Sequence, residues 1–555
     1  MENAIGKLFH SLALGAALFI PCAVEAQDPV VYKVQGLHVA DHLGWDVAVL
    51  DDVDGDGVKD FVASTPFGNR APNDQGSYGY VLLFSGKTGQ QLRRWQGAGP
   101  LDRFGLDLVL YRDVDGDGKR EFLTRSYPSW IHVLSPMKNE TLRSFAVFSR
   151  PQAQNPYATL HVADLDGDRI EDVIVADFDY NLKQFAGDVG VGIGLVVAIS
   201  GATERWMWVT HEEEPESAFA YSAAVIRDVD GDGLSDLVVG EPGRSTDNEG
   251  NYRPAKGRVH ILRGKTGEFL RTIDDDPGAF LGRTMANVGD LDGDSFDELM
   301  VSSQGYARDR GINQGWVGVF STRTWKTIHQ FVGVEGNLAS PYYHGDQLGY
   351  QLSSAGDVDL DGVPDLLIAA NKIHPSPDFT YGQLDLRSGR TGKLLASYQE
   401  RQDLDQWIKA LARLDDVDGD GRPEFLIGAP WLHLYDRSQP VGGDVGRGEV
   451  AVVRYEPHEP RFLRGDVNGD GRMNIADAVS ILRKLYYGIE DGDCLRAYDV
   501  YGDDQISVND FIRTMSFLFF GGYAPSPPFP ECGRFGGLRQ TPLSCRSPSC
   551  ANESD

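Results

Sequence analysis

The chain has 555 residues, of which 82 are acidic and 52 are basic, and its formal net charge is −30. This acidic excess argues against nucleic acid and against an anionic membrane surface as partners, because both repel negative charge. It fits a solvated surface, a set of divalent-cation sites, or both. The length exceeds what one hydrophobic core usually serves, and the 65 glycines are typical of a turn-rich β protein.

The N-terminus has the composition of an export signal. Lys7 precedes an apolar run from Leu8 to Val24, and Val24-Glu25-Ala26 fits a cleavage position. We therefore expect a signal peptide over residues 1–26 and an exported protein that is secreted or held at the cell surface. We expect no transmembrane segment, because no later stretch is long and apolar enough to span a bilayer.

An acidic loop recurs seven times between residues 52 and 424. Each copy has an acid at positions 1, 3, 5 and 9, and position 7 is placed to offer its backbone carbonyl. Alternating carboxylates converge when such a loop curls, and oxygen ligands of this kind select a hard cation, here Ca²⁺. The seven predicted ligand sets are Asp52, Asp54, Asp56, Val58, Asp60; Asp113, Asp115, Asp117, Lys119, Glu121; Asp164, Asp166, Asp168, Ile170, Asp172; Asp228, Asp230, Asp232, Leu234, Asp236; Asp290, Asp292, Asp294, Phe296, Glu298; Asp357, Asp359, Asp361, Val363, Asp365; and Asp416, Asp418, Asp420, Arg422, Glu424.

The loop closes after nine residues, which distinguishes it from an EF-hand. An EF-hand loop ends on an acid at position 12, whereas position 12 here holds residues such as Ala63 and Val239. Because every carboxylate is used as a ligand, we expect the calcium to be structural. Two loops lack glycine at position 6 (Arg169, Ser295) and one has Leu360 at position 4, so we expect weaker binding there.

The loops begin 51 to 67 residues apart, and the rest of each unit repeats with them. Each unit has an apolar stretch before the loop, a β-rich stretch after it and a third run bounded by Gly or Ser, and six units add a fourth. Four strands repeated seven times predict a mainly β fold, a seven-bladed β-propeller. The seventh unit lacks a fourth strand, whereas VVYKVQG (30–36) precedes the first loop without a partner. We predict that this N-terminal strand closes the last blade.

The repeat resembles the FG-GAP repeat of integrin alpha-chain propellers. Phe104-Gly105 matches the first half of that motif, Gly428-Ala429-Pro430 matches the second half, and Gly240-Glu241-Pro242 nearly matches it. The resemblance covers roughly residues 28–456, within a predicted propeller domain of residues 27–458. It implies calcium ligation at positions 1, 3, 5, 7 and 9 of each loop. It also implies that the metal stiffens the blade while a protein or glycan ligand binds elsewhere on the disc.

A different loop begins at Asp466 and meets the twelve-residue rule. It is followed by a stretch with apolar residues at helical spacing, ADAVSILRKLYYG. Asp rather than Glu at position 12, with a helix only after the loop, resembles dockerin modules. This predicts a small α-helical, dockerin-like EF-hand domain over residues 461–523. Its first predicted ligand set is Asp466, Asn468, Asp470, Arg472, Asn474 and Asp477.

The second half of the module departs further from the pattern. Its predicted ligands are Asp499, Asp503, Gln505, Ser507 and Asp510. Tyr501 replaces the usual ligand at position 3 and Asp504 replaces glycine at position 6, so calcium binding at the second loop stays open. The resemblance implies a cohesin-like receptor, but positions 10 and 11 lack the Ser/Thr pair that often reads that partner. A calcium-folded cap or anchor with an unknown partner is the alternative.

A Pro/Ser-rich tail occupies residues 524–555. The cysteines that follow the signal all lie near the C-terminus, and an even, clustered count in an exported protein predicts two disulfides. The sequence leaves three pairings open. The disulfide candidates are Cys494, Cys532, Cys545 and Cys550.

Two functions compete. The first is an exported, calcium-stabilised propeller for adhesion or ligand binding, tethered through its C-terminal module. The second is a carbohydrate-active protein that binds or degrades polysaccharide, since dockerin-like modules often accompany such activity. We find no catalytic motif, because the acids that stand out are already predicted ligands. Whether the chain is an enzyme stays open. His344, Trp407, Trp431 and Tyr342-Tyr343 are candidates for a ligand surface, with a packing role in the core as the alternative.

Overall fold

The computed structural model describes residues 29–38, 41–68, 77–147, 158–178, 194–212, 217–243, 256–277, 280–304, 314–333, 347–373, 380–399, 408–430, 447–455, 463–491, 494–501, 505–522, 524–525 and 529. The chain divides into two compact units, one of which is Pro29–Pro457 and the other of which contains His458–Asp555. Within these described ranges, the helices lack the length and apolar character that crossing a membrane requires.

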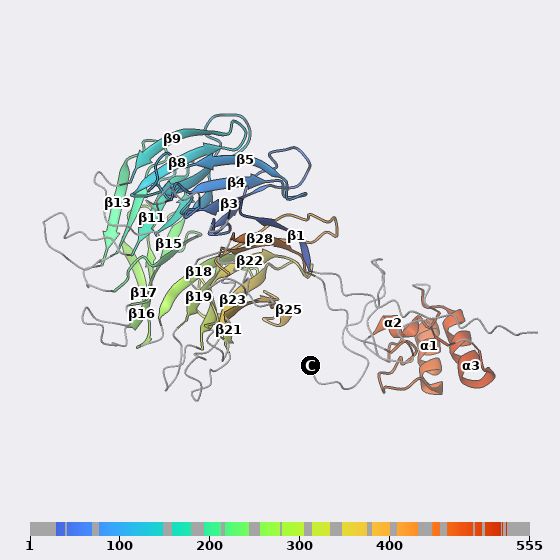
Figure 1. The fold of residues 1–555 in the computed structure, drawn as a ribbon. Helices are drawn as coiled ribbons and strands as arrows, with labels where there is room; N and C mark the ends of the chain where they lie inside the picture. The colour runs from blue at the N-terminus through green and yellow to red at the C-terminus, as the bar shows by residue number, and fades with distance from the viewer. Residues whose placement is uncertain are drawn as a thin grey trace, which may run out of the picture. The chain divides into compact units, whose positions relative to one another are not determined.

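The larger unit consists of seven four-stranded antiparallel sheets, drawn from blue to brown in Figure 1. The first strands are β2 (Val47–Val49), β6 (Leu108–Leu110), β10 (Thr159–Ala163), β14 (Ser222–Ile226), β18 (Leu281–Gly289), β22 (Leu352–Gly356) and β26 (Ala410–Arg413). The second strands are β3 (Phe61–Thr65), β7 (Phe122–Ser126), β11 (Asp172–Asp177), β15 (Asp236–Glu241), β19 (Glu298–Ser303), β23 (Asp365–Ile373) and β27 (Phe425–Ala429).

The outer half of each blade completes the sheet. The third strands are β4 (Tyr80–Phe84), β8 (Trp130–Ser135), β12 (Leu195–Ile199), β16 (Lys256–Leu262), β20 (Trp316–Ser321), β24 (Thr380–Arg387) and β28 (Glu449–Val453). The fourth strands are β5 (Gln91–Gln96), β9 (Glu140–Ala146), β13 (Trp206–His211), β17 (Phe269–Pro277), β21 (Thr327–Val332), β25 (Leu394–Gln399) and, in the last blade, β1 (Val30–Gln35).

The N-terminal strand closes the ring, as predicted. β1 pairs antiparallel with β28, with Val34 opposite Val450 and Gln35 opposite Glu449, and Figure 1 shows the blue strand beside the brown one. Each first strand also contacts the first strands of the neighbouring blades, in a cycle that returns from β26 to β2. The seven-bladed propeller is therefore confirmed, and pairing across the ends of the chain leaves no blade incomplete.

The core of the propeller lies between blades. Seven apolar clusters each join two consecutive blades, including the pair formed by the last and the first. Second and third strands such as FVAST of β3 and LVVAI of β12 are buried throughout, because blades cover both of their faces. Runs of β-branched and aromatic residues suit strands that are buried on both sides.

The antiparallel order divides the connections between two faces of the disc. The acid loops join first to second strands, and the turns between third and fourth strands lie on the same face. Connections from second to third strands, and from each blade to the next, begin and end on the opposite face. The first strands therefore start on this opposite face and run toward the acid loops.

The smaller unit contains two thirteen-residue helices, α1 (Ile475–Tyr487) and α3 (Val508–Phe520), and one turn, α2 (Leu495–Tyr498). Asn474 and Ser507 cap the two long helices, each in a capping box with the Asp three residues later. Each helix ends at a glycine in the left-handed conformation. Equivalent residues are 33 positions apart, so the unit is an internal duplication around a shared apolar core.

Candidate metal centres and an axial cavity

The seven acid loops share one pattern of hydrogen bonds between their carboxylates and their own backbone amides. In every loop the position 1 carboxylate accepts the amide of position 6, at 2.7 to 3.0 Å. The position 3 carboxylate accepts the amide of position 5, and the position 5 carboxylate accepts the amide of position 7. These side-chain bonds to local amides fold each loop back on its own acids.

Arg169, Ser295 and Leu360 stand where other loops have glycine, and they adopt the same left-handed backbone. Their φ angles are 67°, 73° and 62°, compared with 81° at Gly55. The position 6 amides of Arg169 and Ser295 still donate to position 1, each at 2.9 Å. A side chain in this region costs roughly 1–2 kcal/mol. These three loops therefore carry backbone strain but keep the position 1 contact.

The acid at position 9 is buried in all seven loops. One of its oxygens accepts the amide of position 2, as in the 2.7 Å bond from Val53 to Asp60. Burial, followed by the nearby loop acids, raises the pKa of the closing carboxyl to about 6 at Asp60, about 7 at Glu121 and about 8 at Glu424. Without a cation, ionisation of this buried carboxyl therefore destabilises the folded loop.

Four loops close with aspartate, and there the second carboxyl oxygen binds a glycine amide in the turn between third and fourth strands. A side chain is excluded at this glycine, since a Cβ on Gly264 would lie 1.8 Å from the carbonyl oxygen of Ser235. The bond ties the loop to the turn on the same face. The four pairs are Asp60–Gly86 at 3.0 Å, Asp172–Gly201 at 2.9 Å, Asp236–Gly264 at 3.0 Å and Asp365–Gly389 at 3.0 Å.

Three loops close with glutamate, and the matching position after the third strand is not glycine. The residues at this position are Pro136, which has no amide hydrogen, Thr322, whose amide donates to Asp297 at 3.2 Å, and Tyr455, which follows β28. One oxygen of the closing glutamate is then buried without a hydrogen-bond donor among the described residues. These orphaned atoms are Oε1 of Glu121, Oε1 of Glu298 and Oε1 of Glu424. Leaving such an atom unpaired is costly, which points to a partner other than the protein.

The donor set fits a hard divalent cation. Ligand oxygens of Asp113, Asp115, Asp117 and Glu121 lie within 4.8 Å of one another. The same holds for members of other loops, namely Asp52, Asp54 and Asp56; Asp164, Asp166 and Asp172; and Asp228, Asp230 and Asp236. Oxygen donors at this spacing, with an orphaned buried oxygen in the glutamate-closed loops, are what Ca²⁺ requires. When bound, the ion would supply positive charge beside these buried carboxyls, which would favour their ionised form.

The first loop of the smaller unit brings its predicted acids together. Asp466 and Asp477 are fully buried. Asp466 accepts the amide of Gly471 at 2.8 Å, and Asp477 accepts those of Val467 at 2.7 Å and Asn474 at 2.8 Å. Burial raises the pKa of Asp466 to about 6. This loop thus has the buried, amide-organised carboxylates that the propeller loops have.

The second loop of that unit differs at its first position. Asp499 is buried and forms a 3.1 Å ion pair with the buried guanidinium of Arg464. Asp510 accepts the amides of Tyr501 and Ser507, each at 2.8 Å, whereas Gln505 is exposed. A protein cation therefore already neutralises the position 1 carboxylate. Sequence reasoning missed this arginine, which precedes the first loop and serves the second.

Part of the predicted set lies outside the described residues. This applies to the signal peptide and to the aromatic and histidine candidates for a ligand surface. Among the disulfide candidates, Cys494 is described and buried. The two-disulfide interpretation stays a prediction. The site and cysteine positions outside the described residues are Asp503, Cys532, Cys545 and Cys550.

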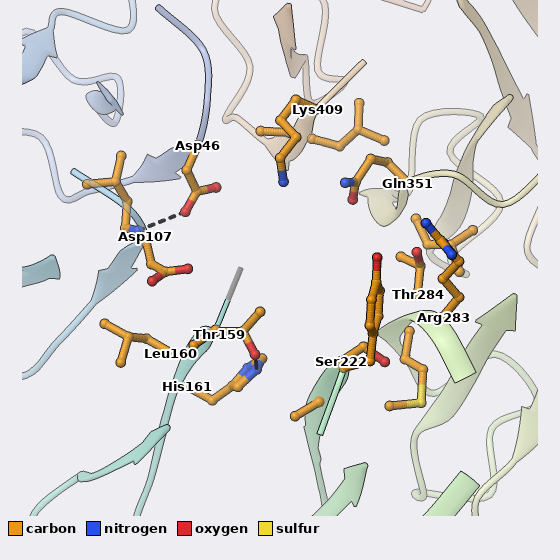
Figure 2. Close-up of a pocket in the computed structure, with 18 of the residues that line it drawn as sticks. Asp46, Asp107, Thr159, Leu160, His161, Ser222, Arg283, Thr284, Gln351 and Lys409 are labelled. Atoms are coloured by element: carbon orange, nitrogen blue, oxygen red, sulfur yellow. Dashed lines mark hydrogen bonds between the residues drawn. The ribbon is translucent and has the colours of Figure 1, made fainter. Parts of the chain in front are cut away.

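The second candidate site is a cavity of about 820 Å³ on the axis of the propeller. Residues at the start of each first strand, or immediately before it, line the cavity in all seven blades, on the face opposite the acid loops. Figure 2 shows the labelled side chains of Asp46, Asp107, Lys409, Gln351 and Arg283 around this space. Sequence reasoning missed the cavity, because its lining takes only a few residues from each of seven blades.

The fold and the loops together define a seven-bladed propeller with one acid loop in each blade. Family models agree with this class: the FG-GAP repeat matches residues 219–262, the FG-GAP-like repeat matches residues 113–175, and the Dockerin type I domain matches residues 464–518. The chain carries FG-GAP repeats followed by a dockerin type I domain, as predicted.

Known proteins with related sequences are integrin alpha chains. The chain is 31% identical over 202 residues to Integrin alpha-PS2 of Drosophila melanogaster, covering 34% of this chain and 12% of that protein. It is 32% identical over 210 residues to Integrin alpha-IIb of Homo sapiens, covering 36% and 19%. The chain thus spans less than a fifth of either relative. A crystal structure of BBS1N in complex with ARL6DN, soaked with lead, aligns with a TM-score of 0.43 and 10% identity over 77% of this chain and 96% of that chain.

Proposed function

We propose that this chain is an exported, calcium-binding FG-GAP propeller that binds a protein or glycan ligand and attaches to a larger assembly through its dockerin module. The observation that carries the proposal is the hydrogen-bond pattern that all seven acid loops share, with the closing acids buried on one face of the disc. Calcium on that face would stiffen the blades and leave the opposite face for ligand. The similarity to integrin alpha chains supports ligand binding as the role of such a disc.

The dockerin helices support attachment to a partner protein. Large apolar side chains are exposed on both, including Tyr487 at 77% and Phe520 at 82%. These two residues are 33 positions apart, as are Ile475 and Val508, which are 56% and 49% exposed. The internal duplication thus presents two equivalent apolar faces, each suited to covering by a partner. A cohesin-type receptor is the partner that a dockerin implies.

The experiment that tests this function measures both activities on the full chain. Calorimetric titration with a panel of cohesin modules should detect binding in calcium and none after chelation. Tyr487→Ala and Phe520→Ala should each retain binding, because the other face remains, whereas the double variant should lose it. Arrays of extracellular proteins and glycans then test the propeller. The proposal fails if the calcium-loaded chain binds neither cohesins nor any arrayed ligand.

A second candidate function is processing of polysaccharide, and one observation favours it. Asp46 and Asp107 both line the axial cavity, and burial together with the charge of Asp107 raises the pKa of Asp46 to about 7. Two carboxyls in one cavity, one of which stays partly protonated near neutral pH, form an arrangement that general acid–base chemistry uses. Release of shortened products from a polysaccharide panel, lost in Asp46→Asn and in Asp107→Asn, would establish it.

A further inference from the structure

The axial cavity has a donor side made by three consecutive blades. Lys409 and Gln351 immediately precede the first strands of blades seven and six, Arg283 lies in the first strand of blade five, and the three side chains surround the same space (Figure 2). None of these three side chains makes a hydrogen bond or an ion pair with any residue that the structure describes. Lys409 Nζ lies 5.1 Å from the ring centre of Trp45, and the Arg283 guanidinium lies 5.1 Å from that of Tyr221. Their N–H groups are therefore available to a guest in the cavity.

The facing side of the cavity is built from two carboxylates that are fixed in place. Asp46 accepts the amides of Val47 at 2.9 Å and of Leu108 at 2.7 Å, so two adjacent blades hold its carboxylate. Asp107 is ion-paired with Arg125, whose side chain is only 6% exposed. Both acids are thus rigid acceptors, and Lys409 partly balances their charge.

The remaining wall offers rings and neutral polar groups. Tyr221 and Tyr350 line the cavity next to Arg283 and Gln351. Thr159 and His161 occupy the third blade, joined by a 3.2 Å hydrogen bond, and burial lowers the pKa of His161 to about 4. This wall therefore carries no charge at neutral pH. Flat rings beside neutral donors and acceptors suit the alternating apolar and hydroxyl surface of a sugar.

We propose that the axial cavity binds a carboxylate-bearing saccharide, with its carboxylate at Lys409, Gln351 and Arg283 and its hydroxyls donating to Asp46 and Asp107. This inference rests on the proposed ligand-binding function and names the site and the ligand class. The volume, about 820 Å³, lies in the range of ligand pockets and accommodates a short oligosaccharide.

The arrangement of charges separates this ligand from others. A ligand ammonium placed against Asp46 and Asp107 would meet the Lys409 cation already there, whereas a hydroxyl donates to a carboxylate without adding charge. A neutral saccharide would leave the two cations without an anion, and an acidic one supplies it. An acidic peptide is the competing class, and it lacks the array of hydroxyls for the two fixed carboxylates.

The test is calorimetric titration of the calcium-loaded full chain with trigalacturonate, with maltotriose as the neutral counterpart and triglutamate as the acidic peptide. Lys409→Met and Arg283→Met each remove one cation without changing the fold's apolar core. Lys326→Met is the matched control, because Lys326 is exposed in a turn on the calcium-loop face. Thermal unfolding of each variant confirms that the propeller is folded.

We expect trigalacturonate to bind more tightly than maltotriose, and each cavity variant to weaken it by about 10- to 100-fold, the range for a charged hydrogen bond. Lys326→Met should match the wild type. The proposal is overturned if trigalacturonate does not bind, if triglutamate binds more tightly, or if both folded cavity variants keep wild-type affinity. In that last case the propeller is still a ligand-binding protein with its site elsewhere, so the broader function survives.

Discussion

The four aspartate-closed blades and the three glutamate-closed blades differ in how the buried closing carboxylate is hydrogen-bonded. In the first group the buried closing acid has protein donors on both oxygens, one of them the glycine of the outer turn, such as Gly264 for Asp236. In the second group the longer side chain leaves one oxygen without a donor, as at Glu424 Oε1. We therefore expect loops with the same acid spacing to depend on a cation to different degrees.

Calcium removal should have the largest effect and should separate the two groups. Each site adds about 2.7 kcal/mol at 100 times its Kd, so losing several ions lowers the unfolding temperature strongly. The blades of Glu121, Glu298 and Glu424 should open first, because their buried oxygens then have no partner. Hydrogen exchange measured by mass spectrometry should show β7, β19 and β27 losing more protection than β3 and β15. Equal losses in all blades would contradict the distinction.

A side chain at the turn glycine should break the aspartate-closed arrangement. Gly264→Ala places a Cβ where the Ser235 carbonyl oxygen stands, and we expect a loss of about 3 kcal/mol, at the upper end of overpacking costs. Thr322→Ala is the matched control in a glutamate-closed blade. It removes only the 2.7 Å bond from Thr322 Oγ1 to Asp297, worth about 1 kcal/mol. Urea unfolding in calcium measures both, and equal losses would count against the turn as a structural lock.

The stability of the metal-free protein should depend on pH through the buried closing acids of both groups of loops. Glu121 and Glu298 have pKa values of about 7 and Asp60 and Asp365 of about 6, all above the unfolded values of about 4. Folded carboxyls with raised pKa favour the folded state at low pH and lose that contribution as pH rises through the folded pKa. Unfolding temperature in metal-free buffer should therefore fall between pH 5 and pH 8. A constant or rising value would contradict this reading.

Much of the fold followed from the spacing of acids. The repeat predicted the number of blades. The last unit lacks a fourth strand and VVYKVQG at the start lacks a partner, which predicted the closure by β1. Both depend on patterns that are local in the chain. The left-handed positions of the loops were also predictable, since glycine marks them in most copies and φ is positive in all of them.

The coupling between closing acid and turn was not predicted, although its signal is in the sequence. Aspartate closure accompanies glycine at residues 86, 201, 264 and 389, and glutamate closure accompanies Pro136, Thr322 and Tyr455. The partners are 24 to 29 residues apart along the chain, and only the pairing of second and third strands brings them together. The cavity could not be predicted from the repeat, because the sequence of one blade does not show which side chains the seven first strands bring together at the axis.

The smallest effect concerns strain in the loops. Leu360 is 50% exposed and has a φ of 62°, so Leu360→Gly removes the left-handed penalty without losing core packing. We expect a gain of about 1 kcal/mol in calcium-loaded protein. The equivalent change at Arg169 should give a similar gain, and calorimetric unfolding measures both. An unchanged or lower unfolding temperature would mean that these side chains contribute contacts that offset the strain.

Thermal unfolding of Glu424→Gln beside Asp236→Asn, with and without calcium, shows whether the orphaned oxygen of a glutamate-closed loop is a metal ligand. If the glutamate-closed loop is a metal site with an orphaned oxygen, glutamine should raise the unfolding temperature of metal-free protein at pH 8, where a buried charge is removed, and lower it in calcium, where a ligand is lost. Asp236→Asn should lower it in both buffers, because the bond pattern with Gly264 needs two acceptors. A Glu424→Gln variant that loses stability equally in both buffers would show that Glu424 is not a metal ligand.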